Sequence, residues 1–223
     1  MSDYYLLTAV LIVLVLGAVK GYKKGFLRLA VWFAGLIASL FIVTKISPYV
    51  SDFLIRNTTL YDNMREKIVE AYETRMTDSD SENAVIDSFG FPTIIADDLK
   101  TNNTGEIYER LAVSLFKDYV SGYLSALAIK SGTFAGLFIL LAIIWFVVIM
   151  AVRILEKIPV LKTFNRLLGM ATGITLSLVL VWVFFLAVMM FFGNSFGSWV
   201  FAQVKASRLL SFLFNNNILF ELL

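Results

Sequence analysis

A short basic segment between two long apolar runs constrains the fold of this chain more than any other feature. Lys20–Arg28 holds four cations and no anion, while apolar residues fill nearly all of Tyr4–Val19 before it and Phe26–Val43 after it. A run of about 20 apolar residues is long enough to cross the hydrocarbon core of a bilayer as a helix. The segment therefore predicts a tight turn between two membrane spans.

The composition of the whole chain agrees with a membrane protein. Of its 223 residues, 59% are hydrophobic and 16% are charged, whereas a soluble globular protein is about 45–50% apolar and about 25% charged. The sequence contains neither Cys nor His, which removes disulfides, thiolate nucleophiles, Cys/His zinc sites and the Ser-His-Asp triad. We expect no catalytic residues, no metal site and no cofactor.

Two further apolar runs predict a second pair of spans. Thr133–Val152 and Leu167–Phe192 carry no charge, and both are long enough to cross a bilayer. The fold class that we predict is an all-α integral membrane protein, with four transmembrane helices arranged as two hairpins. The first hairpin occupies residues 1–46 and the second occupies residues 131–193.

The segment between the two hairpins has a different character. Residues 47–130 contain 14 acidic and 8 basic residues, which predicts a water-exposed, extracytoplasmic helical region. Pro48 is expected to end the second span. Leu60–Met76 has apolar residues at four-residue spacing and predicts an amphipathic helix. Gly105–Lys130 is expected to continue into the third span as one long helix, with a bend near Ser131–Gly132.

The last segment, residues 194–223, is apolar but interrupted. Lys205, Arg208 and the run Asn215–Asn217 argue against a fifth span. We predict an interfacial helix that lies on the membrane. One face of this helix is expected to carry Trp199, Gln203, Ala206, Leu210 and Leu213.

The charges of the two short turns predict the orientation in the membrane. Short loops rich in Lys and Arg stay in the cytoplasm, and the two turns carry eight cations against the single anion Glu156. Both termini and residues 47–130 are then outside. The cations are Lys20, Lys23, Lys24, Arg28, Arg153, Lys157, Lys162 and Arg166.

Glycines recur at four-residue spacing in and near the spans. Such spacing lets helix backbones approach closely in lipid. Three interpretations stay open: packing between helices of one chain, self-association into a homo-oligomer, and glycines that membrane helices merely tolerate. The candidates for helix packing are Gly17, Gly21, Gly25, Gly132, Gly136, Gly169 and Gly173.

The spans offer little chemistry of their own. None has an ionisable residue in its central part, which argues against an ion-coupled transporter. A passive oligomeric pore stays possible. Its lining would use hydroxyl groups of the spans, those of Ser39, Thr44, Thr172, Thr175 and Ser177.

The two hairpins show a weak sign of duplication. A shift of 138 residues places Phe26 on Phe164, Arg28 on Arg166 and Gly35 on Gly173. This alignment predicts a parallel repeat related by an axis along the membrane normal. Shared membrane-protein composition explains the matches about as well.

Two motifs give the chain a resemblance to a known family. The first is Gly21-Tyr22-Lys23-Lys24-Gly25-Phe26. The second runs from Ile158-Pro159-Val160-Leu161 to Phe164-Asn165-Arg166-Leu167-Leu168-Gly169. In these motifs the chain resembles the CvpA family of bacterial inner-membrane proteins, named for colicin V production. The motif residues that carry the resemblance are Phe26, Pro159, Asn165, Arg166 and Gly169.

The resemblance implies a function but no catalytic residue. It implies a multi-pass protein of the bacterial cytoplasmic (inner) membrane that supports toxin production or export, or envelope homeostasis. Such a protein would contact the lipid bilayer and act through a membrane or extracytoplasmic protein partner, without nucleic acid. From the residues alone, Arg166 could bind a lipid phosphate or an acidic group, or serve only as topogenic charge with Asn165 as a helix N-cap. The alternative function is a passive channel or transporter subunit.

Overall fold

The computed structural model describes residues 4–74, 82–111, 113, 115–151 and 162–223. Within these ranges every element is a helix. Four helices are long and apolar enough to cross a membrane, which confirms the predicted all-α, four-span class. They are α1 (Tyr5–Lys24), α2 (Phe26–Asn57), α7 (Phe116–Ala151) and α8 (Lys162–Val188).

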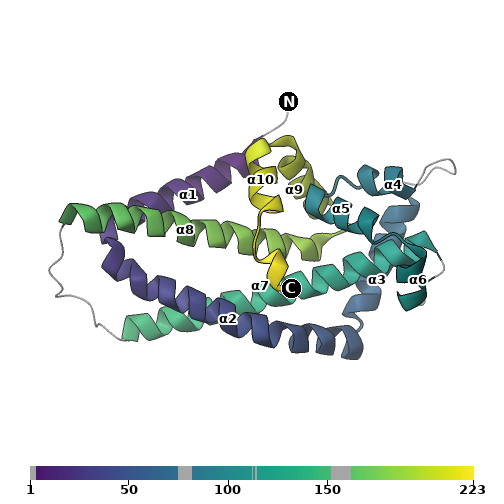
Figure 1. The fold of residues 1–223 in the computed structure, drawn as a ribbon, viewed down its shortest axis with the longest axis horizontal. Helices are drawn as coiled ribbons and strands as arrows, with labels where there is room; N and C mark the ends of the chain where they lie inside the picture. Colours follow the sequence, from purple (N-terminus) through teal and green to yellow (C-terminus); the bar gives the residue numbers. More distant parts are fainter. Residues whose placement is uncertain (1–3, 75–81, 112, 114, 152–161) are drawn as a thin grey trace.

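The long helices pack in pairs across the two hairpins. The most extensive contact joins α1 to α8 and the next joins α2 to α7, whereas the chain neighbours α1 and α2 touch only slightly. Figure 1 shows α1 beside α8 and α2 beside α7. We call the end where α1 stops and α2 and α8 start the basic end, and the opposite end the acidic end.

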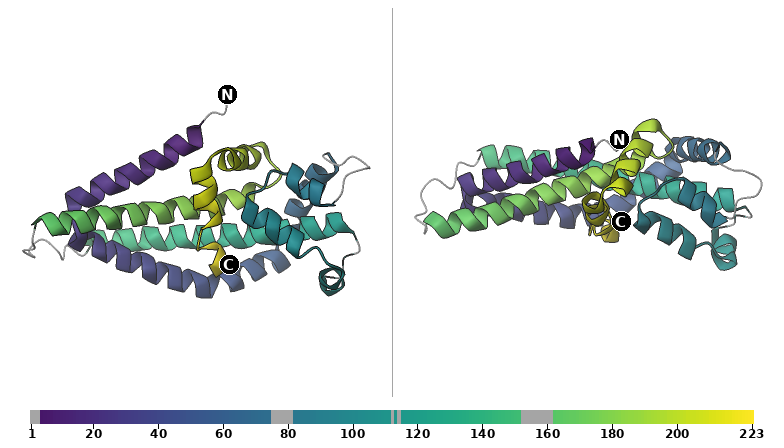
Figure 2. Two further views of the ribbon diagram at one scale, coloured as in Figure 1. Left: turned by 45° about the horizontal axis from the view of Figure 1, so that its top comes forward. Right: turned by 90° about the horizontal axis from the view of Figure 1, so that it is seen from above.

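Pro48 does not end the second helix, so this prediction was wrong. Helix α2 continues through Pro48 to Asn57. Proline removes one backbone donor from a helix and presses on the preceding turn. Side-chain hydrogen bonds occupy carbonyls around this point: the Thr44 hydroxyl donates to Leu40 at 2.8 Å and the Ser51 hydroxyl to Pro48 at 3.0 Å. The helix bows rather than stops (Figure 2).

The acidic region forms four short helices at one end of the molecule (Figure 1). The expected amphipathic stripe is confirmed in α3, where Met64, Ile68 and Tyr72 are buried. Met76, at the end of the predicted stripe, lies outside the described residues. The four helices are α3 (Leu60–Glu73), α4 (Glu82–Ser88), α5 (Thr93–Thr101) and α6 (Gly105–Leu111).

The long helix predicted to start at Gly105 is divided in a different place. Helix α6 ends at Leu111, and α7 starts at Phe116 and continues without a break through residues 131 and 132. The rings of Tyr108 and Tyr119 have centroids only 5.4 Å apart. Eleven residues of one straight helix span about 16 Å, so this aromatic contact requires α6 to fold back on α7.

The C-terminal segment also contains two helices where one was expected. Helix α9 (Ser195–Ala206) ends before Ser207, whose hydroxyl accepts a hydrogen bond from the backbone of Leu210 and caps α10 (Arg208–Asn215). The break changes the buried face. Leu210 and Leu213 are buried as part of that face, but Trp199 is exposed. The short helices η1 (Met189–Phe191) and η2 (Phe220–Leu222) flank this segment.

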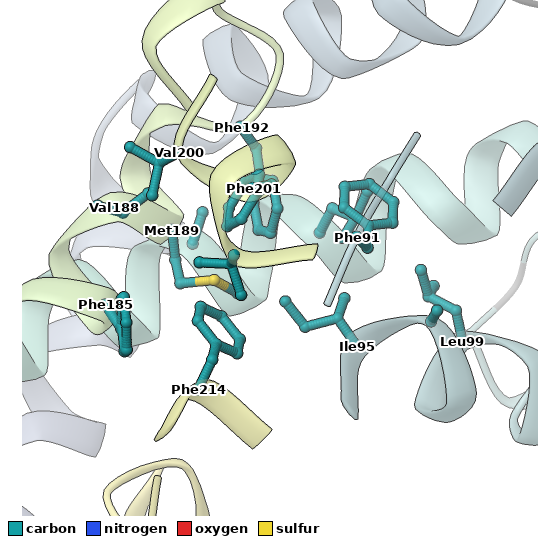
Figure 3. Packing of buried hydrophobic residues seen from close by; sticks show 14 of the residues in the cluster. Phe91, Ile95, Leu99, Phe185, Val188, Met189, Phe192, Val200, Phe201 and Phe214 are labelled. Carbon is teal, nitrogen blue, oxygen red and sulfur yellow. The ribbon is translucent and has the colours of Figure 1, made fainter. Parts of the chain in front are cut away.

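One apolar core unites the acidic region, the end of α8 and the C-terminal helices. Figure 3 shows Phe91 and Ile95 from the acidic region facing Met189, Phe201 and Phe214. Hydrogen bonds between segments reinforce this core. The Asn215 side chain accepts from the backbone N–H of Ile94 at 3.2 Å, which caps α5, and the indole of Trp182 donates to the carbonyl of Leu213 at 2.9 Å.

Candidate functional site

The two motifs that are far apart in the sequence meet at the basic end. Helices α1 and α8 run antiparallel there. Gly25 approaches Asn165, Gly21 approaches Gly169, and Gly17 approaches Gly173. We call this contact the glycine seam; its members are Gly17, Gly21, Gly25, Gly169 and Gly173.

The glycine seam brings two helix backbones into direct contact. A Cβ atom on Gly21 would overlap the carbonyl oxygen of Gly169, and one on Gly169 would lie 2.8 Å from the Cα of Gly25. A Cβ atom on Gly17 would lie 2.6 Å from the carbonyl oxygen of Gly173. No side chain larger than hydrogen fits these positions, so the sequence spacing here serves close packing within one chain.

Gly25 has a second reason to be glycine. Its φ of 77° lies in the left-handed region, which other residues adopt only at a cost. This backbone conformation ends α1 and starts α2 within a single residue. A side chain at Gly25 would also overlap the amide of Asn165, so the turn and the helix contact depend on the same position.

The basic end carries cations on the last turns of α1 and the first turns of α2 and α8. Lys20, Lys23 and Lys24 are exposed on the last turns of α1. The guanidinium of Arg166 lies 5.6 Å from the ring centroid of Tyr22, a cation–π geometry that links the two motifs. Arg28 and Lys162 lie on the first turns of α2 and α8. Arg153, Lys157 and Pro159 lie outside the described residues.

Asn165 does not take the position expected of it, and Phe26 takes no part in the glycine seam. Asn165 is not an N-cap, because α8 starts three residues earlier, at Lys162. Its side chain instead lies against Gly25. Phe26 is half-buried at the start of α2. The second motif thus contributes Gly169 and the amide of Asn165 to the α1·α8 contact.

The remaining predicted packing glycines behave differently. Gly132 packs against the side chain of Met190, whereas Gly136 has open space around it. The structure therefore brings Gly132, but not Gly136, into a contact within the chain. Gly35 was not among the predicted packing glycines, yet it receives the indole of Trp145 from α7. A tryptophan within an apolar span could have signalled this contact, because its N–H needs an acceptor in lipid.

The hydroxyl groups considered for a pore are engaged or buried within the described part of the chain. Thr172 and Thr175 donate to carbonyls of their own helix, at 2.9 Å and 3.2 Å. Ser177 is buried against Gly17. Ser39 is buried on α2, and Thr44 donates to its own helix. The arrangement favours helix packing as the role of these groups.

The acidic region holds polar groups in an otherwise apolar interior. Burial, together with the nearby carboxylate of Glu82, raises the pKa of Tyr108 to about 12 and raises the pKa of Tyr72. Both phenols are therefore neutral at physiological pH. The charged residues remain nearer the surface, where Lys100 pairs with Asp87 at 2.7 Å and Lys117 with Glu73 at 3.4 Å.

The chain has four helices that can span a membrane, a glycine seam between α1 and α8, and a folded acidic end. These features define a multi-pass membrane protein. Comparison of the chain with models of known protein families, with curated proteins and with solved structures gave no match.

Proposed function

We propose that this chain is a non-enzymatic, CvpA-like protein of the bacterial inner membrane, which supports envelope homeostasis or the production and export of a colicin V-type toxin. One observation carries the proposal. The two motifs of the resemblance, separated by more than 130 residues in sequence, lie against each other at Gly25 and Asn165. Residues from two separate motifs that form one contact are better explained as one structural unit than as two chance matches.

The proposed mode of action is through protein partners at the acidic end. The spans present apolar surface to lipid, and the acidic end presents a folded, charged surface to water. In our proposal the acidic end is outside the cytoplasm, as the basic turns predict. A membrane or extracytoplasmic partner would then meet α3 to α6, and a homo-oligomer is one form that such an assembly could take.

Cysteine labelling tests the orientation directly, because the natural chain contains no Cys. Asp97→Cys and Lys23→Cys place single thiols on exposed positions at opposite ends. An impermeant maleimide should label the first variant in intact cells and the second only after permeabilisation. The reverse pattern would overturn the orientation and, with it, the side on which partners are expected.

Crosslinking and reconstitution test the function. A photoreactive residue at Asp97 should crosslink to a discrete protein in membranes, whereas one at the exposed, lipid-facing Ile143 should not. Cells that lack the protein should lose toxin secretion or become sensitive to envelope stress, and the natural chain should restore them. Selective solute flux through the purified protein in liposomes would reject the proposal in favour of a channel.

A further inference from the structure

One arginine of the basic end is positioned by an aromatic ring from the other helix of its pair. The guanidinium of Arg166 on α8 lies over the ring of Tyr22 on α1, 5.6 Å from the ring centroid. Both residues are exposed, Tyr22 by 43%. A cation–π contact uses the face of the guanidinium, and the N–H groups along its edge remain available to an acceptor. The two residues thus form a positioned donor group at the surface.

No carboxylate pairs with this arginine in the described part of the chain. Helices α1 and α8 contain no Asp or Glu. The single acidic residues of α2 and α7 are Asp52 and Asp118, which lie near the acidic end of these helices. The chain end at Leu223 lines a pocket with residues of α3, and Glu156 lies outside the described residues. The ion pairs found among the described residues all belong to the acidic end.

The stacked pair lies at the level of the lipid head groups. The hydrocarbon core ends close to Lys20, the first charged residue of α1. Because Gly25 lies against Asn165 and the helices are antiparallel, Arg166 is level with Lys24. The helix rises about 6 Å from Lys20 to Lys24, and the head-group layer is about 5–8 Å thick on each side of a bilayer. Arg166 therefore stands where lipid phosphates lie.

An exposed apolar surface continues from the pair into the bilayer. Met170 follows Arg166 by one turn on the same face of α8, and it is 38% exposed. Val15 precedes Tyr22 by two turns on the same face of α1, and it is 58% exposed. Acyl chains can lie against this surface while the phosphate of the same lipid meets the guanidinium. A free anion would gain nothing from the apolar surface, so the geometry favours a lipid.

We propose that Arg166 and Tyr22 bind the phosphate of an anionic phospholipid in the leaflet at the basic end. The guanidinium donates two N–H groups to two phosphate oxygens, and the hydroxyl of Tyr22 is a further donor beside it. The glycine seam contributes indirectly, because the close approach of α1 and α8 brings the ring under the guanidinium. The acyl chains stay in the bilayer, against the exposed face below the pair.

This lipid site is separate from the proposed partner function. It lies at the opposite end of the molecule from the surface proposed for partners, and it does not depend on which side of the membrane is outside. A failed partner search would leave the lipid site intact, and a loss of lipid binding would leave the partner function intact.

Native mass spectrometry of the purified full chain in detergent tests the site. The probes are phosphatidylglycerol, which is anionic, and phosphatidylcholine with the same acyl chains, which has no net charge. We expect phosphatidylglycerol to bind more tightly. Arg166→Gln should weaken the binding of phosphatidylglycerol about five-fold, the effect of one cation at a membrane surface, and should bring the affinities of the two lipids closer together.

Two further variants test the geometry at constant charge. Lysine cannot bind two phosphate oxygens as a planar fork, so Arg166→Lys should bind phosphatidylglycerol more weakly than the natural chain but more tightly than Arg166→Gln. Tyr22→Leu removes the ring and the hydroxyl and should weaken binding about two-fold or more. Thermal unfolding without added lipid checks that each variant folds, and the two Arg166 variants keep the test informative if Tyr22→Leu does not fold.

Lys20 offers a matched control on the same turn of α1. It is exposed, but it stands two residues from Tyr22 and so lies on a different side of the helix. Lys20→Gln removes one positive charge at the same membrane level. We expect this variant to bind phosphatidylglycerol nearly as tightly as the natural chain.

Three outcomes would overturn the proposed lipid site. Equal losses in Arg166→Gln and Lys20→Gln would show unspecific attraction between charges. Undiminished binding in folded Arg166→Lys or Tyr22→Leu variants would show that the stacked pair forms no site of its own. Displacement of phosphatidylglycerol by an equal concentration of inorganic phosphate would show a site for a free anion rather than for a lipid.

Discussion

The pairs α1·α8 and α2·α7 are both antiparallel, yet they pack by different means. In α1·α8 the two backbones touch along the glycine seam. In α2·α7 a large side chain enters a gap instead: the indole of Trp145 lies over Gly35 and donates to the carbonyl of Val31 at 3.2 Å. Trp32 and Phe146 add a second aromatic contact, with centroids 5.6 Å apart.

The weak sequence repeat makes this difference informative. Exchange of the two hairpins by a two-fold axis would turn the α1·α8 contact into α7·α2, and the structure has both contacts. The repeat aligns Gly173 with Gly35, and both glycines face the partner helix of their pair. The same opening therefore accepts a backbone in one pair and an indole in the other. A backbone cannot move away from an added atom, whereas a side chain can rotate.

The largest effect is expected in the glycine seam. Gly21→Ala adds a Cβ that overlaps the carbonyl oxygen of Gly169, so α1 and α8 must separate. Overpacking of this kind costs about 1–3 kcal/mol or more, and thermal unfolding in detergent should show a marked loss of stability. Gly136→Ala is the matched control, because Gly136 has open space and alanine gains about 0.5–1 kcal/mol in a helix. Equal stability of the two variants would contradict the close seam.

A smaller loss of stability, which a second substitution can partly restore, is expected in the α2·α7 pair. Gly35→Ala adds a Cβ that overlaps the indole of Trp145, at a cost of about 1–2 kcal/mol. Trp145→Leu in the same chain removes the overlapping ring and should restore part of the loss. A double-mutant cycle measures this coupling. Absence of coupling would show that Gly35 and Trp145 are not in contact. In the glycine seam, by contrast, we expect no side-chain substitution to restore the stability lost in Gly21→Ala, because the overlap there is with backbone.

The four spans could be predicted from the sequence because their cause is local. Uncharged apolar runs and basic turns predict the membrane spans without knowledge of the fold. The stripe of α3 could be predicted for the same reason, since Met64, Ile68 and Tyr72 recur on one helical face. The glycine spacing likewise indicated close packing, but not that α8 rather than another copy of the chain would be the partner.

The missed features depend on contacts between distant segments. The break before α7 follows from the contact of Tyr108 with Tyr119, which helix propensity does not encode. Asn215 served only as an argument against a fifth span, yet its side chain caps α5, more than 100 residues earlier in the chain. Proline at 48 predicts a helix end locally, but α2 continues through it.

A third substitution isolates the hydrogen bond in the aromatic pair. Trp145→Phe keeps a ring near Gly35 but loses the donor to Val31. Hydrogen bonds between membrane helices contribute about 0.6 kcal/mol on average, so we expect a loss of that order in the free energy of unfolding. Trp199→Phe, at an exposed position, should change little. Equal losses in the two variants would mean that the ring, not the hydrogen bond, matters in the pair.

The smallest effect is expected from a hydroxyl on α7. Thr133 is buried, and its hydroxyl has no hydrogen-bond partner within the described residues. Valine has the same shape without the polar group, so Thr133→Val should stabilise the protein by up to about 1 kcal/mol. Thr44→Val, in contrast, loses the 2.8 Å bond to Leu40 and should be neutral or slightly destabilising. A loss of stability in Thr133→Val would show that the hydroxyl has a hydrogen-bond partner in the membrane.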